Sequence, residues 1–210
     1  AVVMEKRNGK RPLFTLSENA RSRYFSGRAF ANELEPPVYL VTSQGYISYG
    51  KALNVMMALR DLIGESQVNH ALKTITDKHR NINKLEANSV ELLDEFYKVT
   101  PQDQHILIDD WFKKVITYDL SAEDSSFKAL ENGTFEVTIK VKAKRFETMD
   151  NGEIKQISIN EPIKIGVFAK HPRLISKEDT ILYLESHQIN KETIEHKIIV
   201  DQLPKYIAID

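Results

Sequence analysis

The first half of this chain is organised around one apolar stretch, GYISYGKALNVMMALRDLIGE, at residues 45–65. On a helical wheel its apolar residues occur almost all the way round, and only Lys51, Asn54 and Asp61 gather on one side. Such a helix belongs in the interior of a larger α-helical domain. The stretch therefore predicts a buried helix, which Gly64 is expected to end as its C-cap.

One face of the predicted helix begins at Tyr49 and continues through Leu53, Met56, Arg60 and Ile63. This spacing places the phenol at the helix entrance, with its hydroxyl at the rim of the surface against which the helix packs. Two interpretations of Tyr49 stay open from the residues alone. It is either a core tyrosine whose hydroxyl reaches a backbone partner, or a functional hydrogen-bond donor.

The order of residues in this stretch resembles a segment of a known enzyme family. The stretch has Tyr49, any residue, Lys51 and a small residue, followed by a long apolar helix that ends in Ile63-Gly64-Glu65. This order is similar to the segment downstream of the zinc site in gluzincin zinc aminopeptidases, the aminopeptidase N family. Where that family usually has glycine, this chain has Ala52.

The resemblance covers most of the chain, from about Leu13 onward. It is closest to bacterial members whose peptidase half is joined to a membrane-spanning, transporter-like half. In those members a segment like Glu35-Pro36-Pro37-Val38-Tyr39 precedes the helix, and a segment like Ile165-Gly166-Val167-Phe168-Ala169 lies in a terminal β domain. The chain is thus expected to be the extramembrane part of a bacterial protein that is membrane-associated through its other segments.

The resemblance implies a role for Tyr49, and Tyr46, three residues earlier, is a second candidate by its position. Tyr49 is expected to donate a hydrogen bond to the oxyanion that forms when a zinc-bound water attacks the peptide carbonyl. Tyr46 is a candidate substrate-binding tyrosine, with packing of a turn residue on the helix as the alternative. The expected partners are a peptide substrate and an upstream catalytic zinc domain of the same polypeptide, which would supply zinc as the cofactor.

The sequence lacks the zinc-binding motif of such an enzyme. Gluzincins hold zinc with a His-Glu-x-x-His helix and a later glutamate, because that spacing puts both imidazoles on one helix face. None of the six histidines here occurs in that pattern. The chain is therefore predicted to follow the zinc site, to hold no cofactor itself and to be inactive alone. His187 and His196 could meet across a strand pair, but two histidines make a poor metal site.

Composition limits the other function classes. The chain has 210 residues, of which 41% are hydrophobic and 28% are charged, as expected for a folded globular protein. A formal charge of −1 gives no electrostatic reason to expect nucleic acid or an anionic membrane surface as partner. With no cysteine, disulfides and thiolate metal sites are excluded. No apolar run approaches the roughly 20 residues of a spanning helix, and no signal peptide is expected.

Helical patterns fill the chain up to about residue 118. After a short strand at residues 1–4, helices are expected from Ser17 or Asn19 to Ala31, over residues 45–64, and from about Val68 to His79. A capping box at residues 88–91 predicts the next helix, to Val99. Thr100-Pro101-Gln102-Asp103 then carries three helix start signals, and the helix that it opens is expected to include Trp111 and Val115.

The hydrophobic period changes from helical to alternating after this point. Apolar residues alternate with charged residues over 135–144, which is typical of a strand with one solvated face. Asn132-Gly133 and Asn151-Gly152 are hairpin turn signals. Further strands are expected at 154–159, 162–169, 181–189, 192–200 and 206–209. The predicted fold is α+β, with a helical subdomain at 1–118 and an antiparallel, Ig-like β-sandwich at 119–210.

Two functions stay open on the sequence alone. The chain is the C-terminal part of a zinc metallopeptidase of the aminopeptidase type, or it is a non-catalytic scaffolding or peptide-binding extramembrane module of a transporter-like membrane protein. The two differ in whether an intact zinc motif lies upstream in the parent protein.

Overall fold

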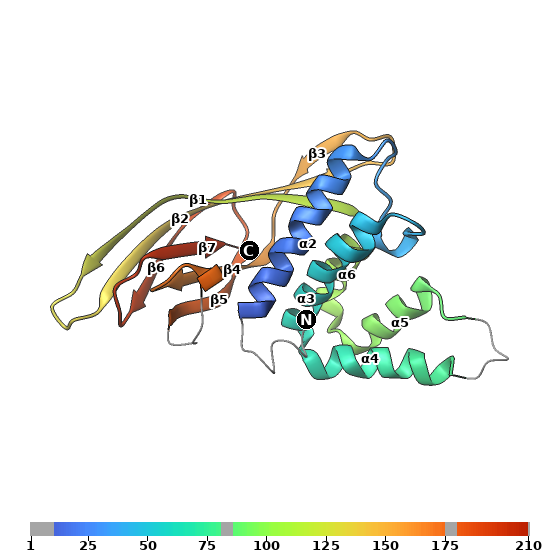
Figure 1. Cartoon of the computed structure of the whole chain (residues 1–210), viewed down its shortest axis with the longest axis horizontal. Coiled ribbons are helices and arrows are strands. Elements are labelled where there is room, and N and C mark those ends of the chain that lie inside the picture. The colour runs from blue at the N-terminus through green and yellow to red at the C-terminus, as the bar shows by residue number, and fades with distance from the viewer. Residues whose placement is uncertain (1–10, 81–85, 175–179, 210) are drawn as a thin grey trace. The chain divides into compact units, whose positions relative to one another are not determined.

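The computed structural model of the chain describes residues 11–80, 86–174 and 180–209. Figure 1 shows an α+β fold in which the described part has five α-helices followed by two antiparallel sheets that pack together. The chain divides into two compact units. A helical unit comprises Ser17–Ile116 and the hairpin tip Thr148–Glu153. A β unit comprises Thr117–Glu147 and Ile154–Asp210, together with the chain up to Leu16, which includes the start of the first described helix. The predicted strand at residues 1–4 lies outside the described residues.

The helices of the first unit are short and are joined by irregular turns. Single 3-10 turns occur at Val38–Leu40 and Gln102–Gln104, and π-helical turns at Ile47–Lys51 and Asp109–Lys113. The α-helices are α2 Arg11–Phe30, α3 Ala52–Ile63, α4 Glu65–Lys78, α5 Ser89–Val99 and α6 His105–Ile108.

Two of the predicted helix boundaries are confirmed by their hydrogen bonds. Gly64 ends α3 with a φ of 85°, and its N–H donates to the Arg60 carbonyl at 2.8 Å. Only glycine adopts such a φ without strain. At the start of α5, the Glu91 N–H donates to the Asn88 side chain at 3.0 Å, and the Glu91 carboxylate accepts the Asn88 N–H at 3.4 Å. The predicted capping box is therefore present.

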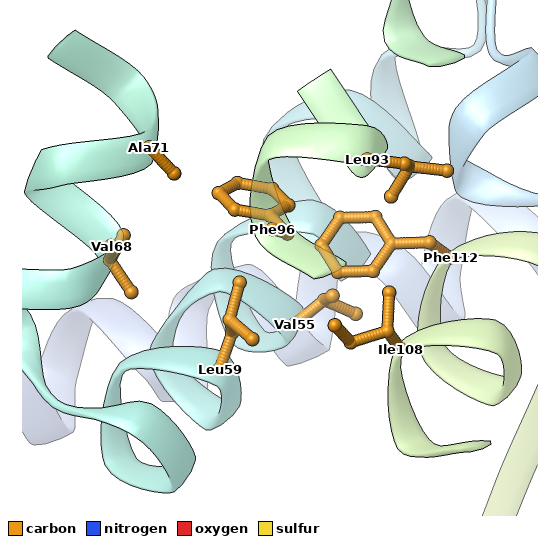
Figure 2. Close-up of a cluster of buried hydrophobic side chains, with 8 residues drawn as sticks. All are labelled: Val55, Leu59, Val68, Ala71, Leu93, Phe96, Ile108 and Phe112. Carbon is orange, nitrogen blue, oxygen red and sulfur yellow. The ribbon is translucent and has the colours of Figure 1, made fainter. Parts of the chain in front are cut away.

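The core of the helical unit is built by four segments. Figure 2 shows the side chains of α3, α4 and α5 converging with those of α6 and the turn that follows it. The Phe96 and Phe112 rings lie 5.7 Å apart at its centre. Burial of apolar surface from segments distant in sequence fixes how the helices pack. The buried members are Val55, Leu59, Val68, Ala71, Leu93, Phe96, Ile108 and Phe112.

The central helix is less buried than its sequence predicts. Among the residues of α3, only Val55 and Leu59 are buried, and the apolar side chains on its other faces are half-exposed. The prediction of a buried helix is therefore confirmed only for the side that carries Val55 and Leu59. Lys51, which the sequence places on the polar side, is itself buried, with 8% of its surface exposed.

The end of the helical unit also differs from the prediction. Instead of one helix from Thr100 to Val115, the chain forms a 3-10 turn, the four-residue helix α6 and a π-helical turn. Val115 then begins strand β1, Val115–Ala129, which the sequence did not predict. Most of β1 is exposed and lacks apolar alternation, so its conformation is decided by pairing with its neighbour.

The β unit consists of a four-stranded and a three-stranded antiparallel sheet. In the first sheet the order is β1-β2-β3, and β6 also pairs with β2; in the second it is β5-β4-β7. The predicted turns are confirmed, with a φ of 83° at Gly133 and 84° at Gly152. The remaining strands are β2 Phe135–Thr148, β3 Ile154–Ile157, β4 Glu161–Phe168, β5 Ile181–Ile189, β6 Thr193–Val200 and β7 Tyr206–Ile209.

The two sheets share an apolar interior. Alternate residues of β2, β4 and β6 form one cluster, and a second cluster involves β4 and the end of β5. Between the sheets, the Arg145 guanidinium lies 2.9 Å from the Glu161 carboxylate, which also accepts the Tyr118 hydroxyl at 2.5 Å. This buried pair is satisfied by its own partners.

Candidate functional site

The candidate site lies in the helical unit, at the π-helical turn that leads into α3. Tyr49 occupies the middle of this turn and has 71% of its surface exposed. Its hydroxyl makes no hydrogen bond to any residue that the structure describes. Tyr49 is therefore not the core tyrosine of the first interpretation, because its hydroxyl has no backbone partner among those residues.

The backbone under Tyr49 is held by buried neighbours. Ile47 is fully buried, and Gly50 contacts the backbone of α2 directly. A Cβ at position 50 would lie 2.9 Å from the Tyr24 nitrogen and 3.0 Å from the Ala20 carbonyl oxygen. Only glycine fits there without moving one of the two segments. The turn is thus fixed against α2 while the phenol projects from it into solvent.

A buried carboxylate anchors the same turn. Glu35 keeps only 3% of its side chain exposed and lies 2.9 Å from the Lys51 ammonium and 2.9 Å from the Arg28 guanidinium. Its two oxygens also accept the Tyr24 hydroxyl, at 2.8 and 3.0 Å. A buried carboxylate with two cations and a hydroxyl donor has its hydrogen-bonding capacity satisfied. We call Tyr24, Arg28, Glu35 and Lys51 the Glu35 cluster.

The electrostatics of the Glu35 cluster follow from its burial. Burial lowers the pKa of Lys51, and this effect outweighs the opposite effect of the Glu35 charge. Burial also raises the pKa of Tyr24, and the nearby Glu35 charge raises it further. Tyr24 therefore remains a neutral hydroxyl donor at physiological pH, and the cluster acts as a fixed support.

Tyr46 lies beside the cluster and combines two roles. The Tyr46 ring stacks on that of Tyr24 with the centroids 6.2 Å apart. Tyr46 also packs so closely on α2 that a Cβ added at Gly27 would clash with the Cβ of Tyr46. Burial raises the pKa of Tyr46. Its hydroxyl is shielded from solvent, without a hydrogen bond to any described residue.

Tyr46 also lines an open hollow of about 530 Å³ between the end of α2 and the turn at residues 43–46. In its wall, the Gln44 amide donates to the Glu33 carboxylate at 3.0 Å. The Tyr49 ring lies 4.0 Å from where a Cβ at Gly45 would be, so it is close to one residue of the lining. The lining residues are Gly27, Phe30, Ala31, Asn32, Glu33, Ser43, Gln44, Gly45 and Tyr46.

The structure brings the two candidate tyrosines to one region but separates their environments. Tyr49 presents an exposed hydroxyl, whereas the Tyr46 hydroxyl is enclosed. In the β unit, the predicted approach of His187 and His196 is confirmed by a ring-centroid distance of 4.5 Å. Over residues 11–80, 86–174 and 180–209, no group of three or more His, Asp or Glu side chains is arranged to hold a metal ion.

Sequence reasoning missed the Glu35 cluster. In the sequence, Glu35 stands out only as part of the segment Glu35-Pro36-Pro37-Val38-Tyr39 in the family resemblance, and Lys51 as a residue of the polar side. One signal was available, because a lone lysine in an otherwise apolar helix needs a buried anionic partner if that helix packs closely. The sequence does not say which carboxylate that partner is.

Neither the models of known protein families nor the curated protein sequences contain a match to this chain. In the part that the structure describes, no helix is both long and apolar enough to cross a membrane.

Proposed function

We propose that this chain is the C-terminal part of a zinc metallopeptidase of the aminopeptidase type, in which Tyr49 stabilises the oxyanion. The observation that carries the proposal is the contrast within one turn. Tyr49 is 71% exposed, while Ile47 is fully buried and Lys51 has only 8% of its surface exposed. An aromatic side chain left in solvent on a fixed backbone is suited to bind something outside the chain.

The proposed role of Tyr49 depends on its unused hydroxyl. A phenol is a neutral donor near pH 7, and a hydrogen bond to a substrate carbonyl oxygen strengthens as negative charge collects there. A fixed donor stabilises that charge without reorganising during the reaction. The Gly50 contact and the Glu35 cluster supply this rigidity, because they hold the residues on the C-terminal side of Tyr49.

The zinc of such an enzyme would be held by an upstream domain, because the described residues contain no suitable ligand group. In the parent protein the metal would activate the attacking water. The proposed contribution of this chain is the hydroxyl of Tyr49, together with the hollow that Tyr46 lines as a place for part of a peptide.

One observation favours the second function, a peptide-binding or scaffolding module without chemistry. Phe30 lines the hollow and is 85% exposed, and Glu33 adds a carboxylate to the same wall. An apolar ring beside a carboxylate can bind a peptide side chain without any reaction. In that case Tyr49 would serve as a contact residue only.

The experiment that tests the proposal uses the longer polypeptide that contains the upstream segment. Tyr49→Phe keeps the ring and removes the donor, so kcat for an amino-acid anilide should fall by about 10²–10³, the usual loss for one oxyanion donor. KM and the melting temperature should change little. Tyr206→Phe, which removes a hydroxyl from a half-exposed tyrosine in the β unit, is the matched control and should keep full activity.

Two results would count against the peptidase function. Unchanged kcat in Tyr49→Phe, in an active enzyme, would show that the tyrosine has no part in the reaction. A longer polypeptide that binds peptides but cleaves none of them, with zinc supplied, would favour the binding module instead.

A further inference from the structure

Two imidazoles meet inside the β unit, where the chain passes from β5 to β6. The ring centroids of His187 and His196 lie 4.5 Å apart, with the ring planes at 55°. In the strand register His187 is opposite Ile163 of β4, and His196 is opposite Ile139 of β2. Cross-strand partners share a sheet face, and both isoleucines are buried core residues. The two histidines therefore extend from the inner faces of opposite sheets.

His187 has a hydrogen-bonded relay on its own strand. Its Nε2 lies 2.6 Å from the Tyr183 hydroxyl, and that hydroxyl donates to the Glu185 carboxylate at 3.1 Å. A phenol has one proton to donate. Because Glu185 accepts that proton, the neutral His187 ring is best assigned its own proton on Nε2. A positively charged His187 would keep this hydrogen bond, because the phenol oxygen can still accept it.

His196 has no equivalent support. Its Nε2 is shielded from solvent and makes no hydrogen bond to any described residue. Burial lowers the pKa of His196, and the neighbouring His187 lowers it further. The titratable groups that face the pair are Tyr183 and Glu185 of β5. On the same inner face, β4 also carries Glu161, two residues before Ile163, and this carboxylate is paired with Arg145 of β2. The positions nearest the two rings on the other strands are apolar, namely Ile139, Val141, Ile163, Ile165, Ile194 and Ile198.

We propose that His187 and His196 form a proton-sensitive contact between the two sheets, which stabilises the β unit near neutral pH and weakens when both rings become charged. Two imidazolium rings at this separation repel each other. The second proton would also place an N–H of His196 where the described residues offer no acceptor. A metal ion is a poorer occupant, because two nitrogens fall short of the ligands that a stable zinc site needs.

The direction of the pH dependence follows from His196. In the unfolded chain its imidazole has the ordinary pKa of 6.5, and in the folded chain the pKa is lower. Between these two values the unfolded chain binds more protons, so stability decreases as the pH falls. The contribution is fully present above about pH 6.5 and is lost as the pH falls from there to the lower, folded pKa.

The test is carried out on the whole chain, in urea, at about pH 7.5 and about pH 5. Unfolding of the β unit is monitored through the methyl signals of Ile198, and the histidine ring protons are titrated by NMR. The unfolding constant of the wild type should rise more on acidification than that of His196→Gln, because the lowered pKa of His196 is absent from the variant. His70→Gln, at an exposed position on α4, should behave as the wild type.

A second variant keeps the test decisive if His196→Gln folds poorly. In His187→Gln the charge next to His196 is absent, so the His196 titration should move up toward its ordinary midpoint. Equal pH dependence in the wild type and both variants would overturn the proposal. So would stabilisation by added Zn²⁺ that disappears in His196→Gln, because the pair would then be a metal site.

Discussion

The Lys51 ammonium lies 2.9 Å from the Glu35 carboxylate, and the two side chains expose only 10% and 3% of their surface. This pair connects the turn under Tyr49 to the segment that follows α2. The two residues are 16 positions apart in the sequence, and only one 3-10 turn and the π-helical turn that Lys51 ends lie between them. The pair therefore fixes a stretch that has little regular structure of its own.

The first prediction concerns the two ends of this pair. Glu35→Gln should destabilise the helical unit by about 3–5 kcal/mol, because Lys51 and Arg28 would stay buried or half-buried beside a neutral group. Lys51→Met should cost less, since Glu35 would keep Arg28 and the Tyr24 hydroxyl as partners. Burial already opposes the charge on Lys51 by lowering its pKa. Urea unfolding followed by Trp111 fluorescence measures both variants, and equal losses would contradict the expected order.

A second prediction tests the close contact of the turn with α2. Gly50→Ala would bring a methyl group within 2.9 Å of the α2 backbone, so it should destabilise the helical unit by about 1–3 kcal/mol, as overpacking does. Gly45→Ala is the matched control, because its nearest neighbour lies 4.0 Å away. That change should stay within about 0.5 kcal/mol of the wild type.

The first of these variants also tests whether the turn positions Tyr49. If Gly50 holds the backbone, the Tyr49 ring signals in NMR spectra should shift in Gly50→Ala. Unchanged ring signals in that variant would show that the close contact with α2 does not place Tyr49.

Local patterns in the sequence predicted several of the regular elements and two of the helix boundaries. The Asn88 capping box and the glycine at 64 each specify a boundary through nearby hydrogen bonds, so three or four residues contain the whole signal. Alternation over β2 likewise needs only one strand and one buried face. Strand β1 was not predicted, because its residues are mostly exposed and show no alternation of apolar and polar side chains. Its partner is β2, which comes later in the sequence.

The arrangement of the candidate site could not be predicted in the same way. Its defining contacts join residues far apart in sequence, such as Gly50 with Tyr24 and Lys51 with Glu35. Helical periodicity places Tyr49 and Leu53 on one face, but whether that face is covered depends on the packing of α2 and of the turns. For this reason periodicity alone left both a buried and an exposed Tyr49 open.

The third prediction concerns the hairpin tip Thr148–Glu153, which belongs to the helical unit. The Arg28 guanidinium donates to the Thr148 hydroxyl at 3.1 Å, and a Cβ at Gly152 would lie 2.9 Å from the Leu34 side chain. A fragment that ends at residue 118 lacks both contacts. It should keep the core of Figure 2, yet melt at a lower temperature than the helical unit of the whole chain.

The matched control for this fragment is the variant Thr148→Val in the whole chain, which removes only the hydrogen bond to Arg28. It should cost about 0.5–1.5 kcal/mol, the usual value of one such bond, and so less than the truncation. A fragment as stable as the intact unit would show that the tip adds nothing to the helical core.

The last prediction concerns zinc and activity in the chain as it stands. The described residues place no three carboxylates or imidazoles together, and zinc sites in proteins need three or four such ligands. After dialysis the chain should therefore retain far less than one zinc per molecule, and it should not cleave amino-acid anilides. Metal analysis and a chromogenic assay, with and without added zinc, measure the two properties.

One tightly held zinc per chain would contradict the prediction, and its loss in His187→Gln would trace the metal to the histidine pair between the sheets. Cleavage without zinc would contradict the proposed dependence on an upstream domain, because Tyr49 alone supplies a hydrogen bond and neither a nucleophile nor a base.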